Sequence, residues 1–168
     1  MSEEEQKYIE KIAGQFSNSF LRSEEFRGDL TLHVRKNEII EVMRSLKESE
    51  DTAFDFLVDI TVVDYLKLGG DERYSVVYHL YSHTYFRRLR VKAWVPEDDL
   101  NVQSMVSVWE TANWMEREAA ELFGITFTGH PDPRNLLLPE DFPGFPLRKD
   151  YPLEGEGYRS DFPDLKNS

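Results

Sequence analysis

Proline is unevenly distributed along this 168-residue chain, and this limits what its last third can fold into. Seven of the eight prolines follow residue 130: Pro131, Pro133, Pro139, Pro143, Pro146, Pro152 and Pro163. Because proline fixes φ and lacks a backbone donor, this segment forms neither a long helix nor a central strand. Its leucines and aromatic residues are nevertheless too apolar for a solvated linker. We therefore predict a globular domain over residues 1–130 and an extended tail over residues 131–168. The tail should lie on a partner protein and exchange its amides quickly in the isolated chain.

Composition narrows the class of protein. With 40% hydrophobic residues the chain can bury the core of one domain. Its formal net charge of −12 argues against binding to nucleic acid or anionic lipid, which both need Lys and Arg. No apolar run is long enough to span a membrane, and the acidic N-terminus lacks a signal-peptide core, so we expect a cytoplasmic protein. Zero cysteines exclude disulfides, thiolate zinc sites and iron–sulfur clusters held by this chain's own thiolates.

Hydrophobic periodicity predicts a two-layer α+β domain. Apolar residues at three- and four-residue spacing indicate helices at 4–17, 38–48 (with Asn37 as N-cap), 101–110 and 112–123. Alternating or β-branched runs indicate strands at 29–35, 54–64, 73–82 and 85–95. In the second of these, Phe56 and Val58 are expected on one face with Ile60 and Val62. The predicted order is a helix, two strands, a helix, three strands, a helix and the long extended proline-rich C-terminal tail.

The densest carboxylate cluster, Glu116, Glu118 and Glu121, lies on the predicted helix 112–123. Two carboxylates can act as general acid and base in glycoside hydrolysis. Glu116 and Glu118, however, point about 200° apart on a helix, so they cannot flank one bond. A solvated face with an Arg117–Glu121 ion pair is the simplest interpretation, and a docking surface for a basic partner is the alternative.

The histidines do not indicate a metal site, whereas the tail contains a candidate contact. His79 and His83 are four residues apart but fall on a strand and a turn, not on one helical face. The tetrad Arg148-Lys149-Asp150-Tyr151 directly follows the apolar residues 144–147. An arginine in such an extended segment suits a bidentate clamp on a partner's carboxylate or backbone. A stiff but free tail is the alternative.

Two blocks of sequence together resemble a known family. WMEREAAELFGI at 114–125, followed by GHP at 129–131 and PLRKDYP at 146–152, closely resembles the 30-kDa subunit of the proton-pumping NADH:quinone oxidoreductase, respiratory complex I. Upstream, LVDITVVDY at 57–65, VYHLYS at 77–82 and RLRVK at 88–92 resemble the same family. The chain departs from the family pattern at Glu121, Asn135 and Phe145, where the family favours Asp, Arg and His.

The resemblance implies a non-redox structural subunit of an oxidoreductase that couples electron transfer from NADH to quinone to proton translocation. It implies a peripheral place in the hydrophilic arm, on the cytoplasmic face of the bacterial inner membrane. No cofactor is expected in this chain, since FMN, iron–sulfur clusters and quinone belong to partner subunits. The implied partners are the quinone-site (49-kDa-like) subunit and the cluster-bearing subunits. Partner contacts are expected from Glu116, Arg117, Glu118, Glu121, His130, Arg134, Phe145, Arg148, Lys149, Asp150 and Tyr151.

Two other functions are compatible with the sequence. The first is the equivalent subunit of a membrane-bound hydrogenase or of a ferredoxin-dependent complex, because the electron donor is not encoded in this chain. The second is a standalone hydrolase that uses the glutamate cluster. Identification of the co-purifying electron-input module tests the first, and turnover by the isolated chain tests the second.

The absence of cysteine and the scattered histidines predict that the chain, purified natively and alone, carries neither chromophore nor metal. Its absorption spectrum should contain only the aromatic band, and elemental analysis should find no stoichiometric metal. A visible band, or one metal ion per chain, would contradict this expectation.

Overall fold

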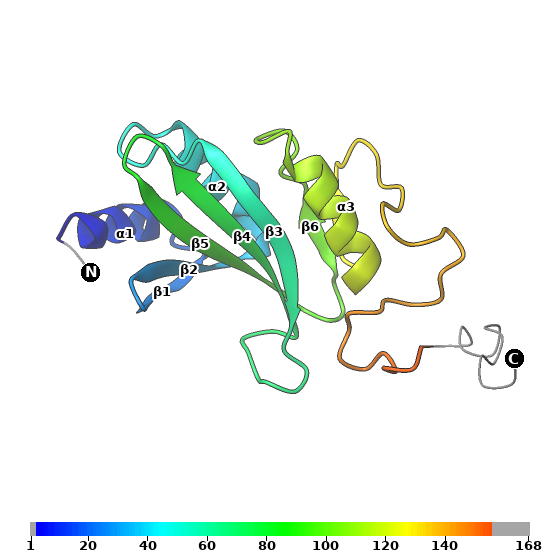
Figure 1. Cartoon of the computed structure of the whole chain (residues 1–168). Coiled ribbons are helices and arrows are strands. Elements are labelled where there is room, and N and C mark those ends of the chain that lie inside the picture. The colour runs from blue at the N-terminus through cyan, green and yellow to red at the C-terminus, as the bar shows by residue number, and fades with distance from the viewer. Residues whose placement is uncertain (1–2, 156–168) are drawn as a thin grey trace, which may run out of the picture.

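The computed structural model describes residues 3–155 and shows a five-stranded sheet with helices packed against it (Figure 1). The elements in chain order are α1 (Glu3–Gln15), β1 (Phe20–Phe26), β2 (Asp29–Arg35), the 3-10 turn η1 (Lys36–Glu38), α2 (Ile39–Glu48), β3 (Phe56–Asp64), β4 (Tyr74–Ser82), β5 (Arg87–Val95), β6 (Asn101–Gln103), α3 (Ala112–Phe123) and β7 (Thr126–Thr128). The α+β class and the predicted order of the main elements are confirmed. Strand β1, for which the sequence pattern defined no range, precedes β2 and is the first strand of the first pair.

The sheet joins two hairpin-linked units through one parallel pair of strands. Its order is β1-β2-β5-β4-β3, in which β2 runs parallel to β5 and all other neighbours are antiparallel. The amphipathic helix α2 follows β2 and buries its apolar stripe against the sheet, through Ile39, Val42, Met43 and Leu46. Helix α3 packs beside the edge strand β3 (Figure 1). This places the end of β3 close to the segment that follows α3.

The predicted helices are wrong at two places. Residues 101–110 form no helix, because Asn101–Gln103 is strand β6, which pairs in parallel with β7, and turns follow it. The helical spacing in this segment arose because turns bury the same apolar residues, Val102, Met105, Val108 and Trp109. Asn37 does not cap α2, since it lies within η1 and α2 begins at Ile39 without a side-chain cap.

The predicted face of β3 is wrong at its beginning. Phe56 and Val58 are exposed, whereas Leu57 is buried with Ile60 and Val62. The pairing with β4 contains an irregularity between Leu57 and Asp59. A β-bulge adds one residue to the strand and so exchanges the two faces, which explains why a strict alternation fails here.

The proline-containing segment lies on its own domain. After β7 the chain descends beside α3, in yellow to orange in Figure 1. We call residues 130–151 the strap. Backbone amides of the strap donate hydrogen bonds to Glu121, Leu122 and Asp64 of the domain. The structure thus attaches residues 130–151 to their own domain, whereas the sequence predicts a tail that is free in the isolated chain. Residues 156–168 of the predicted tail lie outside the described residues.

Candidate functional site: the strap over helix α3

The carboxylate of Glu121 binds the middle of the strap. Glu121 lies in the last turn of α3, and only 6% of it is exposed. Its oxygens accept hydrogen bonds from the backbone N–H groups of Leu136 at 2.8 Å, Leu137 at 2.9 Å and Leu138 at 3.1 Å. Hydrogen bonds to a charged acceptor are stronger than neutral ones, and successive amides form a concave anion site. The strap is thus held through its backbone, which leaves the leucine side chains for other contacts.

Arg117, one helical turn earlier, binds the strap as a donor. Its Nε donates to the carbonyl of Arg134 at 2.8 Å, and its Nη2 donates to that of Asn135 at 3.2 Å. Its guanidinium also stacks 5.1 Å from the ring centroid of Trp114. Since Arg117 and Glu121 both bind the strap, the ion pair predicted between them is replaced by these contacts. Glu118 is exposed on the outer side of α3.

His130 and Asp132 hold the beginning of the strap in place. The Nε2 atom of His130 lies 3.0 Å from the carbonyl of Asn113, and its Nδ1 lies 3.0 Å from the backbone nitrogen of Asp132. A neutral ring with its proton on Nε2 satisfies both contacts. Asp132 accepts two hydrogen bonds of 2.7 Å from Arg134, and this lowers the pKa of Asp132 to about 2.

The C-terminus of α3 receives Arg148. The helix ends at Gly124, whose φ of 74° is left-handed and favours glycine. A Cβ atom at this position would lie 2.7 Å from Cε2 of Phe145, so the strap also needs a residue without a side chain here. Arg148 stacks 4.3 Å from the Phe145 ring and 5.5 Å from that of Tyr74, and its Nε donates to the carbonyl of Phe123 at 2.7 Å.

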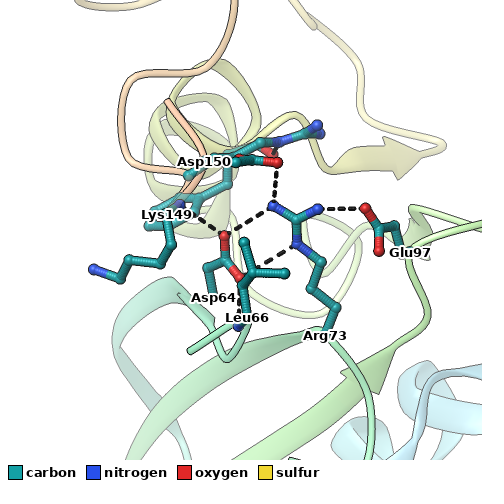
Figure 2. Close-up of polar contacts among 8 residues, drawn as sticks. Asp64, Leu66, Arg73, Glu97, Lys149 and Asp150 are labelled. Atoms are coloured by element: carbon teal, nitrogen blue, oxygen red, sulfur yellow. Dashed lines mark hydrogen bonds and ion pairs between the residues drawn. The ribbon is translucent and has the colours of Figure 1, made fainter. Parts of the chain in front are cut away.

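Asp64, at the end of β3, accepts the far end of the strap (Figure 2). Its carboxylate receives hydrogen bonds from Nη2 of Arg73 at 3.2 Å and from the backbone nitrogens of Lys149 and Leu66, both at 2.9 Å. Burial alone raises the pKa of the Asp64 carboxyl group, but these donors outweigh burial and hold the pKa below its ordinary value. Asp64 therefore stays charged, and it needs its donors.

Arg73 links Asp64 to two further carboxylates. Its Nη2 lies 2.7 Å from Oδ2 of Asp150, and its Nη1 pairs with Glu97. Burial opposes the charge of Arg73, but its three carboxylate partners raise its pKa above the ordinary value. The Lys149 side chain points away from this network in Figure 2, so Lys149 contributes only its backbone.

Glu116 faces the interior of the domain. It is fully buried, and it bonds to Oγ of Ser104 at 2.6 Å and to the backbone nitrogen of Met105 at 2.5 Å. Burial raises its pKa from 4.5 to about 7. Glu116 therefore attaches the segment after β6 to α3 and is not presented to a partner, unlike the role predicted for it.

The other residues that were predicted to contact a partner lie on the strap or on α3, and several of them make contacts within this chain. The charged groups of Arg117, Glu121 and Arg148 bind this chain's own backbone, and their contact with a partner stays a prediction. Tyr151 closes the strap by stacking on Phe142, with ring centroids 6.3 Å apart.

Sequence reasoning missed the receptor for the strap's far end, which is Asp64, Arg73 and Glu97. The sequence did contain one indication of it. Asp64 lies two residues after Val62 and four after Ile60, so it falls on the same, buried face of β3. A carboxylate at such a position requires buried donors.

Comparison with known proteins identifies one family. The family described as "Respiratory-chain NADH dehydrogenase, 30 Kd subunit" matches residues 32–157. The NADH-quinone oxidoreductase C subunit of Geotalea uraniireducens is 45% identical over 152 residues, which is 90% of this chain and 90% of that protein. The C subunit of Geobacter metallireducens is 47% identical over 148 residues, covering 88% of this chain and 89% of its own.

Two solved structures share the fold. Nqo5, described as its trypsin-resistant fragment (1-134), has a TM-score of 0.67 and 31% sequence identity, and the match covers 77% of this chain and 98% of that fragment. A chain of the membrane-bound sulfane sulfur reductase, an archaeal respiratory membrane complex, has a TM-score of 0.71 over 99% of both chains. Its identity is 22%, so it shows a likeness of fold alone.

Replacing Glu116 with glutamine should change how stability depends on pH. The folded-state pKa of about 7 lies above the ordinary 4.5, so the folded protein binds the extra proton and wild-type stability falls as pH rises between these values. The advantage of Glu116→Gln over wild type, measured by urea denaturation, should therefore grow by about 2 kcal/mol between pH 5.5 and pH 8. Glu118→Gln, on the exposed side of the same helix, is the matched control and should show no such growth. A constant difference for Glu116→Gln would mean that Glu116 stays charged when folded.

Replacing Asp150 with asparagine should loosen the far end of the strap without unfolding the domain. Arg73 keeps Asp64 and Glu97 as partners in this variant, so the melting temperature should hardly change. The ¹⁵N heteronuclear NOE of residues 147–151 should fall, because the strap loses its ion pair with Arg73. Lys149→Gln is the control, since the lysine side chain lies outside the network. Unchanged NOE values in Asp150→Asn would show that the Asp64 and Arg148 contacts suffice.

Proposed function

Because the chain belongs to the family of the 30-kDa subunit of respiratory-chain NADH dehydrogenase, we propose that it is a structural subunit that holds neighbouring subunits in place. In this proposal it carries no redox group and does not itself catalyse electron transfer. It lies in the hydrophilic arm, on the cytoplasmic face of the membrane. Its neighbours are the quinone-site subunit and the cluster-bearing subunits.

The observation that carries this proposal is the orientation of the apolar side chains of the strap. Backbone amides of the strap and the side chains of Arg148 and Asp150 bind the domain, whereas Leu137 is 63% exposed and Leu147 is 47% exposed. Trp114 on α3, beside the strap, is 60% exposed. Apolar side chains held outward in a fixed geometry are typical of a protein–protein interface, and Trp and Arg are the residues that most often dominate its affinity.

The chemistry of the chain supports a role without cofactors. The sequence contains no cysteine to ligate an iron–sulfur cluster. Within residues 3–155, no group of three His, Asp or Glu side chains gathers as metal ligands do. In the same residues, no helix combines the length and the apolar character that crossing a bilayer requires.

The fold does not decide which electron donor the proposed complex uses, because a chain of an archaeal sulfane sulfur reductase has the same fold. Identities of 45% and 47% to subunits named for NADH and quinone favour NADH over the hydrogenase or ferredoxin alternatives. The standalone hydrolase loses its basis, since Glu116 and Glu121 are both buried and bonded within the chain.

Truncation after Gly129 should leave a folded domain that no longer assembles. Asp64 and Arg73 still pair with each other in the truncated chain, and Glu121 becomes accessible to water. The melting temperature should fall by no more than about 8 °C, the equivalent of about 2 kcal/mol. Capture of the neighbouring subunits by a tagged chain in cells should be lost.

A second variant separates loss of the strap from loss of its apolar side chains. Leu137→Ser combined with Leu147→Ser keeps the backbone contacts of the strap and should leave the melting temperature unchanged. It should nevertheless reduce capture of the neighbouring subunits at least about tenfold. Normal assembly of both variants would remove the strap from the interface and contradict the proposal.

A further inference from the structure

A small pocket lies between α3, β7 and the beginning of the strap. Its volume is about 160 Å³. Ala120 of α3, Ile125 and Phe127 line it from the domain side, and His130 and Pro133 line it from the strap. Neither of the exposed leucines Leu137 and Leu147 lines it.

Three of the four polar residues that line this pocket, Glu116, Arg117 and His130, are already bonded within the chain, and the fourth, Thr126, is exposed to water. Glu116 bonds to Ser104 and Met105, and both ring nitrogens of His130 have partners. Arg117 donates to two strap carbonyls. A polar occupant would leave its own donors or acceptors unpaired against these groups, which is costly in a partly enclosed site. The pocket is therefore suited to an apolar hydrocarbon group.

The volume fits a single side chain. A cavity of about 150 Å³ lined by apolar residues accepts a benzene molecule, so a space of this size holds one phenyl, leucine or isoleucine side chain. Trp114 and Arg117 stack on each other next to the pocket, and Trp114 is largely exposed. In protein–protein interfaces, a few Trp and Arg residues beside well-packed pockets contribute most of the binding free energy.

We propose that this pocket receives one aliphatic or phenyl side chain of a neighbouring subunit, which packs beside Trp114. The inference rests on the proposed structural function and specifies where the partner inserts. The partner segment is apolar at that point, because Glu116, Arg117 and His130 are already bonded within the chain and Thr126 is exposed to water. The strap forms the outer wall through Pro133 and His130, so it both binds α3 and completes the receptor.

Filling the pocket from within tests the proposal. Ala120 is half-buried, and leucine is a good helix former, so Ala120→Leu should fold with a melting temperature close to that of the wild type. It should reduce capture of the neighbouring subunits by a tagged full-length chain at least about tenfold. Ala13→Leu makes the same change at a half-buried position of α1 outside the pocket, and it should assemble normally.

A thiol probe decides the question even if Ala120→Leu fails to fold. The chain has no cysteine, so Ala120→Cys introduces its single thiol. N-ethylmaleimide should alkylate it readily in the isolated chain and at least about tenfold more slowly in the purified complex, as read from the mass of this chain. Equal rates would overturn the proposal. Protection in the isolated chain would also overturn it, because the pocket would then be closed or filled before any partner subunit binds.

Failure of this inference can be told apart from failure of the proposed function. If Ala120→Leu assembles normally while the chain truncated after Gly129 does not, the pocket is unused and the structural role stands. If both assemble, the structural role itself is contradicted.

Discussion

A charged carboxylate at the end of a buried strand determines how the C-terminal third of this protein is arranged. Asp64 is 1% exposed, and an uncompensated buried charge costs several kcal/mol. Arg73 and the Leu66 amide supply two donors from the adjoining loop, and the Lys149 amide, 85 residues further along the chain, supplies another. The far end of the strap is therefore positioned by the hydrogen bond that the buried Asp64 carboxylate accepts from the Lys149 amide. Glu121, whose carboxylate accepts three consecutive amides, does the same for its middle.

This arrangement reverses the usual division between backbone and side chains. Segments of a globular core bury their apolar side chains, whereas the strap binds the domain through its backbone amides and through Arg148 and Asp150, and it leaves Leu137 and Leu147 exposed. Prolines are tolerated in such a segment, because it pairs with no β-strand and therefore does not need a backbone N–H at every residue. A partner then meets apolar side chains that are already held in place, and it loses less free energy to the ordering of a flexible tail.

Hydrophobic periodicity predicted the elements whose pattern of buried residues only one type of secondary structure produces. The helices α2 and α3 and the strands β2, β4 and β5 belong to this class, as does the overall α+β order. It failed at residues 101–110, where turns bury the same residues that a helix would, and at the bulge in β3. Most residues predicted as partner contacts lie on the strap or on α3, where several of them bind this chain's own backbone, and their contact with a partner stays a prediction. Backbone amides such as those of Leu136 and Lys149 leave no trace in a residue pattern, so the attachment of the strap to its own domain could not be read from the sequence.

In this arrangement the strap is bound to α3 and β3 before any partner binds. Hydrogen–deuterium exchange on the isolated wild-type chain, resolved to single amides, tests it most directly. The amides of Leu136, Leu137, Leu138, Leu147 and Lys149 should exchange at least about tenfold more slowly than those of an unstructured peptide of the same sequence. Exchange of all five at the rate of the unstructured peptide would contradict the account and show that the strap is ordered only by its partners.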